Sequence, residues 1–197
     1  MNPGALLSFL VVSILTSISF AQTQNPQTAP LDSPSSSQLE NERKQLRARA
    51  ETGDRSAQMW LGVSYEQGRG GPRDFQEALK WFRKAAAQGD PDAQVSLGQM
   101  YADGEGVKQN YAVAAKWYRK AADHVPDLGG AGQGRNELGL LYLQGLGVPK
   151  DYVRAYMWFS LTGHQTNLPD AKAEMTPAQI LQAERLVQEW KERHPSP

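Results

Sequence analysis

The chain of 197 residues contains no cysteine. This absence excludes disulfide bonds, a lipid-modified N-terminal cysteine, thiol chemistry and zinc sites with sulfur ligands. The chain also lacks an excess of charge, because 21 Lys and Arg residues balance 21 Asp and Glu residues. A neutral balance gives no general attraction to nucleic acid or to anionic membranes. Stability therefore has to come from apolar packing, and we expect no nucleic-acid partner.

Residues that carry chemistry are equally scarce. The three histidines, His124, His164 and His194, fall in predicted loops or at the C-terminus, without the spacing of a metal-binding pair on a helix. The sequence has no nucleophile elbow and no carboxylate pair in a predicted cleft. Its G-x-G pairs follow predicted helices rather than strands, which indicates tight turns and not phosphate loops. We expect no catalytic residue, no metal, no cofactor, and a protein that is not an enzyme.

The N-terminus has the pattern of an export signal. Residues 1–21 have no charged side chain, an apolar stretch covers residues 5–20, and Ser19-Phe20-Ala21 fits a signal peptidase site. We predict a signal peptide over residues 1–21 and a secreted or periplasmic protein with no membrane span after cleavage. Because no Lys or Arg precedes the apolar stretch, an N-terminal membrane anchor that stays uncleaved is the alternative. Residues 22–37 are rich in Gln, Thr, Ser and Pro, and we predict a disordered linker there.

The rest of the chain contains one pattern three times. A Leu-Gly-x-x-Tyr motif begins at residues 61, 97 and 138, so that its glycines are 36 and then 41 residues apart. An aromatic residue, an alanine and a tryptophan recur at 75, 78 and 81, at 111, 114 and 117, and at 152, 155 and 158. A period in this range marks stacked two-helix units, none of which buries its apolar face alone.

The predicted fold is all-α, a right-handed α-solenoid of helix-turn-helix repeats over residues 38–192. Its parts are a half-unit at 38–53, repeats at about 54–89, 90–130 and 131–166, and a capping helix at 176–192, which covers the last stacking face. Each second helix is expected to follow an N-cap residue. These N-cap residues are Asp74, Asn110 and Asp151.

Glycines inside the pattern lead to two expectations. A glycine inside a helix lowers the stability of the helix by about 1 kcal/mol, yet the repeat keeps a glycine at this position. We therefore predict that Gly62 and Gly98 lie where two helices approach closely. The 41-residue step comes from an insertion that carries four glycines, which we predict to form a flexible loop. These are Gly129, Gly130, Gly132 and Gly134.

The repeated positions resemble the Sel1-like repeat family, a relative of the tetratricopeptide repeats. In the first copy the matching residues are Ala57, Leu61, Gly62, Tyr65, Gly68, Gly70, Ala78, Trp81, Ala85, Ala86 and Gly89. The third copy departs from the pattern at residues 160–162, and Gly71 replaces the valine found at Val107 and Val148. The resemblance covers about residues 39–191. It implies an adaptor or scaffold with protein partners and does not by itself define a function.

The relation to tetratricopeptide repeats also implies that the first helix of each unit lines a concave surface. The candidate partner-binding face lies opposite the core motif on these helices, and it combines an apolar strip with acidic edges. Its residues are Met59, Val63, Glu66, Val95, Gln99, Asp103, Asn136, Leu140 and Leu143. Such a face is expected to hold an apolar or mildly basic segment of another protein.

Two other features each leave two interpretations open. Trp60 has Ser96 and Glu137 as its equivalents, so it either packs against the half-unit or stands partly exposed as a binding anchor. Basic residues recur on the second helices and form either a solvated outer face or a ridge for an anionic partner. They are Lys80, Arg83, Lys84, Lys116, Arg119 and Lys120.

The expected function is a protein–protein interaction adaptor or scaffold that binds a peptide or helix on a concave repeat surface in the cell envelope. One alternative is an exported hydrolase of the β-lactamase-like kind that the resemblance associates with cysteine-rich relatives. Those relatives depend on disulfide bonds, which this chain cannot form. The other alternative is a purely structural protein of the envelope.

The N-terminal pattern gives the first testable prediction. Export is expected to remove residues 1–21, so that intact-mass spectrometry of the mature protein gives a chain beginning at Gln22. A chain that keeps Met1 and fractionates with membranes would support the uncleaved anchor instead.

Overall fold

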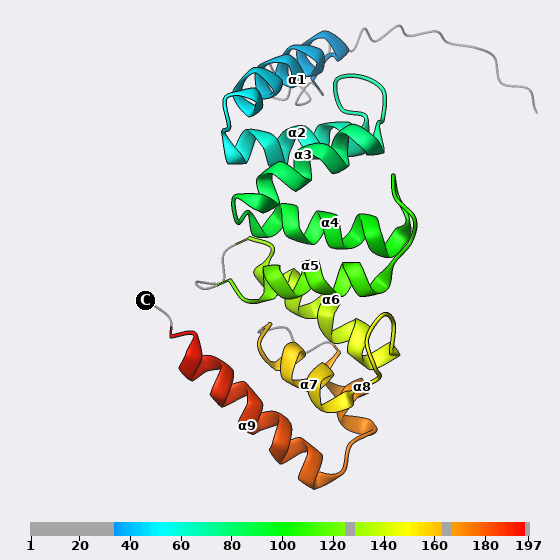
Figure 1. Ribbon diagram of the computed structural model, residues 1–197, viewed down its shortest axis with the longest axis vertical. Helices are drawn as coiled ribbons and strands as arrows, with labels where there is room; N and C mark the ends of the chain where they lie inside the picture. Colours follow the sequence, from blue (N-terminus) through cyan, green and yellow to red (C-terminus); the bar gives the residue numbers. More distant parts are fainter. Residues whose placement is uncertain (1–33, 125–128, 163–166, 196–197) are drawn as a thin grey trace, which may run out of the picture. The chain divides into compact units, whose positions relative to one another are not determined.

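The computed structural model describes residues 34–124, 129–162 and 167–195, which form one compact unit within Pro34–Pro197. This part of the chain contains nine helices and no strand (Figure 1). The predicted all-α solenoid fold is thereby confirmed. The predicted signal peptide, and the linker as far as residue 33, lie outside the described residues.

Three helix pairs form the repeats. The first helices are α2 (Arg55–Gln67), α4 (Pro91–Asp103) and α6 (Ala131–Gln144), and the second helices are α3 (Phe75–Ala87), α5 (Tyr111–Ala122) and α7 (Tyr152–Ser160). From α1 (Ser36–Glu51) to α7, each helix packs against the next one in the chain. The first helices α4 and α6 also touch each other directly. At the other end, α8 (Leu168–Ala173) and α9 (Pro177–Arg193) both pack on α7.

The helices begin where the capping residues place them. The side chains of Asp74, Asn110 and Asp151 each accept hydrogen bonds from backbone N–H groups in the first turn of α3, α5 and α7. These bonds satisfy donors that have no partner inside the helix. The three predicted N-caps are confirmed.

A contact between a glycine and an aromatic ring holds each pair together. A Cβ atom placed on Gly62 would lie 2.6 Å from ring carbons of Phe82, in the second helix of the same unit. Gly98 meets the ring of Tyr118 in the same way, and Gly139 meets Phe159. All three rings are buried. The prediction that Gly62 and Gly98 mark close helix approaches is confirmed, and the reason is that the ring occupies the volume of a side chain.

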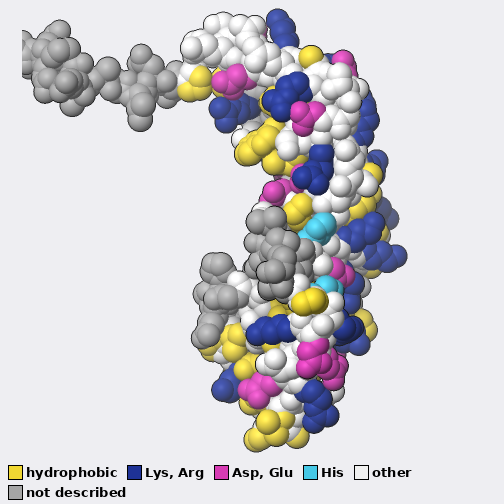
Figure 2. All heavy atoms as spheres, turned by 90° about the vertical axis from the view of Figure 1, so that its left-hand side faces the viewer, with side chains coloured by type: hydrophobic (Ala, Val, Ile, Leu, Met, Phe, Trp, Pro, Cys, Tyr) yellow, Lys and Arg dark blue, Asp and Glu magenta, His cyan; other side chains and the backbone are white. Residues whose placement is uncertain are grey.

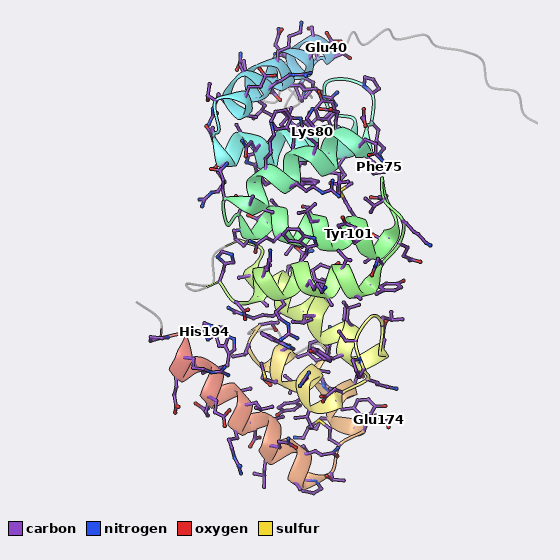
Figure 3. All side chains as sticks on the ribbon, in the orientation of Figure 1. Glu40, Phe75, Lys80, Tyr101, Glu174 and His194 are labelled. Carbon is purple, nitrogen blue, oxygen red and sulfur yellow. The ribbon has the colours of Figure 1, made fainter. Side chains whose placement is uncertain are left out.

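The turn after each first helix packs against the preceding second helix, and this contact shows which position in the repeat α1 has. Gly106 has a positive φ of 68°, and a Cβ atom on it would come within 2.9 Å of the carbonyl oxygen of Phe75, at the start of α3 (Figure 3). Gly147 lies in the same way against Tyr111, at the start of α5, and Gly70 against Leu39 in α1. Leu39, Phe75 and Tyr111 are spaced by 36 residues. Helix α1 is therefore the second helix of a unit, and no first helix pairs with it among the described residues.

The structure corrects three predicted boundaries. Helix α1 begins at Ser36, inside the predicted linker 22–37, because Ser35 and Gln38 form a capping box there. Helix α8 occupies a segment that we expected to link the third repeat to the capping helix. The predicted flexible loop is partly helical, since α6 already begins at Ala131 and includes Gly134. A Cβ atom on Gly134 would lie 2.7 Å from that of Ala121, so the glycine permits a close approach.

The contact between Gly98 and Tyr118 predicts whether a substitution at Gly98 raises or lowers the free energy of unfolding. By helix propensity alone, Gly98→Ala would stabilise the protein by about 1 kcal/mol. Because the new methyl group meets the ring, we expect instead a loss of about 1–3 kcal/mol in the free energy of unfolding, measured in urea. In a Tyr118→Ala background, where the ring is absent, the same change is expected to stabilise the protein, as helix propensity predicts. A gain in the wild-type background would show that the contact does not govern stability.

Candidate functional site

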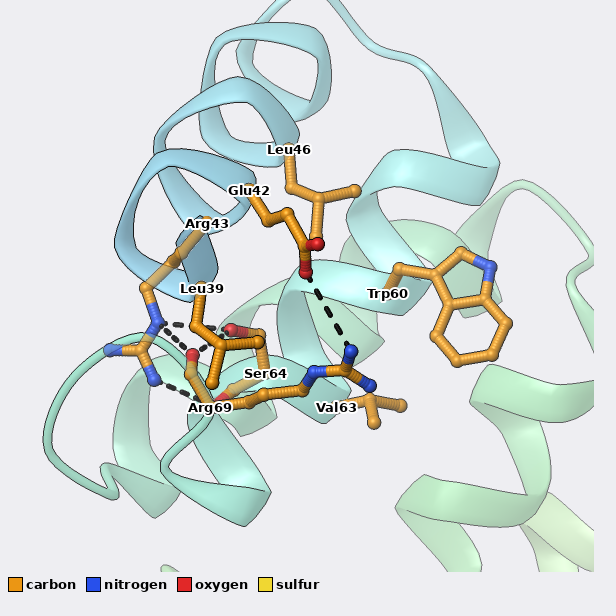
Figure 4. Close-up of a pocket in the computed structure, with 8 residues that line it drawn as sticks. All are labelled: Leu39, Glu42, Arg43, Leu46, Trp60, Val63, Ser64 and Arg69. Carbon is orange, nitrogen blue, oxygen red and sulfur yellow. Dashed lines mark hydrogen bonds and ion pairs between the residues drawn. The ribbon is translucent and has the colours of Figure 1, made fainter. Parts of the chain in front are cut away.

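A pocket of about 290 Å³ lies between α1 and α2, at the N-terminal end of the described unit (Figure 4). We call it the N-terminal pocket, and its lining residues are Leu39, Glu42, Arg43, Leu46, Trp60, Val63, Ser64 and Arg69. Trp60 is 54% exposed, which is unusual for so large an apolar side chain. Trp60 is thus partly exposed, with its ring at the edge of the pocket, and its role as a binding anchor stays a prediction.

The repeat explains why Trp60 is exposed. Its equivalent in the third unit, Glu137, is half-buried, and burial raises the pKa of its carboxyl group, with a further contribution from Asp103 of α4. This repeat position therefore faces the preceding unit. In front of Trp60, α1 is the only helix of the preceding unit among the described residues. The side chain consequently points toward the place that a first helix would occupy, and we call this place the open position.

The residues of α1 show the same incompleteness. Leu46 lies 36 residues before Phe82, which is fully buried against its own first helix, but Leu46 is only half-buried and lines the pocket. Glu42 lies 36 residues before the buried Ala78, and its carboxylate lies 3.7 Å from Arg69. That ion pair is exposed on both sides and contributes about 0–1 kcal/mol. It can therefore open at little cost.

Arg43 joins the two segments that line the pocket, α1 and the C-terminal end of α2 with its turn. Its guanidinium donates to the hydroxyl of Ser64 at 2.9 Å, to the carbonyl of Ser64 at 2.7 Å and to that of Arg69 at 2.8 Å. It also lies 4.5 Å from the ring centre of Tyr65. Several charge-assisted hydrogen bonds of this length hold α1 firmly to the turn after α2.

Arg43 also explains the departure at Gly71. A Cβ atom on Gly71 would lie 2.6 Å from the guanidinium of Arg43. In the next unit the equivalent positions are Leu79 and Val107, which pack together in an apolar cluster. The first unit replaces this apolar pair by an arginine and a glycine. The glycine at position 71, where the later units have valine, is the sequence signal for this contact.

The structure divides the predicted partner-binding face. Met59 and Val63 lie half-buried on α2 beside Trp60, and Gln99 and Asn136 are half-buried on α4 and α6. Asp103 is exposed at the end of α4. Leu140 and Leu143 are half-buried and pack against the largest apolar cluster of the described residues. Met59 and Val63 pack in the same way against the apolar cluster of α3 and α4, so none of the apolar members of the face is fully exposed.

Val95 corrects the prediction. It is 3% exposed and belongs to the core, so it is not part of an exposed strip. The reason is the direct contact between α4 and α6, which covers the face of α4 on which Val95 lies. A triple change of Val63, Val95 and Leu140 to serine would therefore damage the core as well as the surface.

Carboxylates on the same side of the unit stand close to one another. Burial raises the pKa of Glu66, and the negative charge of Glu105 raises it further, while Arg73 acts in the opposite direction. Burial likewise raises the pKa of the Tyr118 hydroxyl, with Glu137 and Asp103 adding to it. Neither Glu66 nor Glu105 forms an ion pair within the part of the chain that the structure describes.

The basic residues of the second helices lie on a different face. All six are exposed, and Figure 2 shows Lys and Arg side chains along its right-hand edge. Lys84 lies 4.2 Å from the ring centre of Trp81, and Lys120 lies 4.4 Å from that of Trp117. These cations therefore cover the outer sides of tryptophans in the repeat signature, where such a contact contributes about 0.5–1 kcal/mol.

Residues 34–124, 129–162 and 167–195 contain neither a metal-binding cluster nor a membrane-spanning helix. No group of three or more His, Asp or Glu side chains lies there in positions that could hold a metal ion. None of the helices in these residues is both long and apolar enough to cross a membrane.

Comparison with known proteins agrees with the repeat architecture. The model of the Sel1 repeat matches residues 55–90, 91–124 and 133–166, together more than half of the chain. The protein belongs to the Sel1 repeat family. Proteins with Sel1 repeats generally mediate protein–protein interactions, and the family is typically a non-enzymatic scaffold. No curated protein matches the chain.

Two solved structures are similar to this Sel1 repeat protein. One is c5321, a protective antigen present in uropathogenic Escherichia coli strains, with 41% identity and a TM-score of 0.57 over 61% of this chain and 25% of that chain. The other is a Sel1 repeat protein from Oxalobacter formigenes, with 34% identity and a TM-score of 0.63 over 78% of this chain and 64% of that chain. The chain thus spans a quarter of the first relative and less than two thirds of the second.

The raised pKa of Glu66 predicts how stability depends on pH. A carboxyl group whose pKa is higher in the folded state destabilises the fold when it ionises, so stability falls as the pH rises above the ordinary value of 4.5. Glu66→Gln removes this loss of stability, because a glutamine side chain does not ionise. We expect the variant to be more stable than the wild type at neutral pH and equally stable below pH 4.5.

The measurement is urea denaturation at a series of pH values. Glu105→Gln removes only the neighbouring charge and leaves Glu66 buried, so a smaller effect of the same sign is expected. A difference between Glu66→Gln and the wild type that is the same at every pH would contradict the assignment.

Proposed function

We propose that this Sel1 repeat protein is an adaptor in the cell envelope and binds a segment of another protein on the side of its first helices. The single observation that carries the proposal is the exposed Trp60 on α2, at the edge of the N-terminal pocket. Partly exposed tryptophans beside apolar pockets are typical centres of protein interfaces. The arrangement resembles an anchor point for an incoming side chain.

The size of the pocket favours a protein segment over a small molecule. Sites for small molecules and cofactors are about 300–1,000 Å³ and enclose most of the ligand. The N-terminal pocket, at about 290 Å³, is at the lower limit of this range. A volume of this size suits one or two large apolar side chains that belong to a longer segment. The half-buried Met59 and Val63 of α2, beside Trp60, extend the contact surface.

The envelope location is supported by the sequence of residues 1–21, with its uncharged apolar stretch and its Ser-Phe-Ala end. The absence of cysteine is compatible with this location, because the helices pack through apolar contacts and need no disulfide bonds. The same absence separates the chain from the disulfide-dependent hydrolases discussed above.

A pair of matched variants tests the proposal. Trp60 and Leu181 are the large hydrophobic residues that are most exposed among the described ones, at 54% and 63%. Leu181 lies on α9, far along the chain from the pocket. Immobilised wild-type protein, Trp60→Ser and Leu181→Ser are each used to capture proteins from an envelope extract of the organism that makes the chain.

We expect Trp60→Ser to lose captured proteins that both the wild type and Leu181→Ser retain. Thermal melting of the three proteins checks that all are folded, since neither side chain belongs to the core. If Trp60→Ser captures the same proteins in the same amounts, the pocket is not the binding site.

A further inference from the structure

The first and second helices of the repeats carry opposite charge. Helices α3, α5 and α7 contain the six exposed Lys and Arg residues described above together with the exposed Arg154, and Glu77 is the only acid in these three helices. In α2, α4 and α6 the acids outnumber the arginines instead. These residues are Glu66, Asp92, Asp103 and Glu137, against Arg55 and Arg135. We call the exposed Lys and Arg residues of α3, α5 and α7 the basic face (Figure 2).

Most cations of the basic face have no carboxylate beside them. Lys80 pairs with Glu77 at 2.9 Å, and Arg154 lies 3.3 Å from Asp151. The remaining cations form no ion pair within the part of the chain that the structure describes. A row of cations that local acids do not neutralise produces a positive potential, which attracts an anionic partner.

The motif tyrosines hold two arginines of the basic face. Arg83 of α3 donates to the hydroxyl of Tyr101 at 2.9 Å, and Arg119 of α5 donates to the hydroxyl of Tyr142. A guanidinium that is already held by a hydrogen bond loses less side-chain entropy when it binds a ligand. These arginines are therefore arranged for binding before a partner arrives.

One repeat position beside the tyrosines changes its charge along the array. At this position the three units have Glu77, Val113 and Arg154. In the third unit Arg154 donates at 3.2 Å to the Tyr142 hydroxyl, which also accepts from Arg119. Two guanidinium groups, one from α5 and one from α7, thus converge on one oxygen atom. Each has several N–H donors, so that donors remain for the carboxylate of a ligand.

The basic face fits an acidic protein segment better than a membrane surface. Surfaces that bind membranes combine basic residues with exposed apolar side chains, which enter the lipid. The large hydrophobic residues that are exposed among the described ones are Trp60 on α2 and Leu181 on α9, and neither belongs to the basic face. Arginine also binds a carboxylate through two parallel hydrogen bonds, which favours Asp and Glu side chains as ligands.

We infer that the basic face is a second docking surface, which binds an acidic segment of another protein and holds one of its carboxylates between Arg119 and Arg154. Further carboxylates of the segment pair with the lysines of α5 and with Arg83 of α3. The inference goes beyond the proposed function, because this surface lies on the second helices and does not include Trp60. A protein with separate surfaces for two partners can join them.

Designed peptides test the inference with the full mature chain. The first probe has Glu at every second position in a Gly/Ser background and is about 12 residues long, too short for a stable helix in water. The second has Gln in place of every Glu. Binding of each fluorescently labelled peptide is followed by anisotropy at low and at physiological salt. Co-sedimentation with phosphatidylglycerol vesicles measures membrane binding separately.

We expect the Glu peptide to bind at least about tenfold more tightly than the Gln peptide, with an affinity that falls as salt is added. Arg119→Gln with Arg154→Gln is expected to weaken its binding by about fivefold or more, since charge-assisted hydrogen bonds are lost. Arg185→Gln with Lys191→Gln removes the same charge from exposed positions on α9 and is expected to have no effect.

A second double variant separates binding from folding, because Arg119 and Arg154 also hold Tyr142. Lys116→Gln with Lys120→Gln changes exposed side chains that form no ion pair within the described residues. We expect this variant to melt like the wild type and to bind the Glu peptide about two- to threefold more weakly, as for exposed ion pairs.

Three results would overturn the inference. They are equal binding of the Glu and Gln peptides, an equal effect of the α5–α7 and α9 arginine variants, and sedimentation with the vesicles that Arg119→Gln with Arg154→Gln abolishes. The last result would make a membrane surface the partner. Trp60→Ser is expected to bind the Glu peptide like the wild type, so that the proposed function and this inference succeed or fail independently.

Discussion

The packing of the helices depends on a close contact between the backbone of a glycine and an aromatic side chain. In each complete unit a glycine of the first helix faces an aromatic side chain of the second, Phe82, Tyr118 or Phe159, at a distance that leaves no room for a Cβ atom. The contact allows the two helices of a unit to approach closely. The second glycine of the turn then lies against the backbone of the preceding second helix, as Gly106 does against Phe75. Two glycines per unit thus set the packing within units and the stacking between them.

The same regularity shows what is unusual at the N-terminal end. Helix α1 keeps the contact with the following turn, through Leu39 and through the hydrogen bonds of Arg43, but no first helix pairs with it within the part of the chain that the structure describes. Only Ala50 of its residues is buried. At the other end α9 buries Ala183, Val187 and Trp190 against the rest of the unit. Among the described residues, α9 therefore covers the last repeat, whereas the unit that contains α1 has one helix only and lies at the end where Trp60 is exposed.

The fold was predictable because each of its determinants is local and repeated. The period, the N-caps and the motif glycines are visible in the sequence, and the structure has them where expected. Features that depend on contacts between units were harder to predict. Val95 has the spacing of an exposed residue, but α6 covers it. Gly134 resembled a loop residue because its role is set by Ala121 in another helix. The pocket was missed because its α1 residues, such as Leu46, gain meaning only when α1 is aligned with the later second helices.

Native-state hydrogen exchange is the most direct test of the claim that α1 is half of a unit. In a stacked array the stability of each element is the sum of its own term and those of its neighbours. Amides of α1 are expected to exchange by local opening at a free energy well below that of α4 and α5, and below that of α9, which is covered on its apolar side. If α1 is protected as strongly as α4 and α5, its packing face is already occupied, and no open position exists beside Trp60.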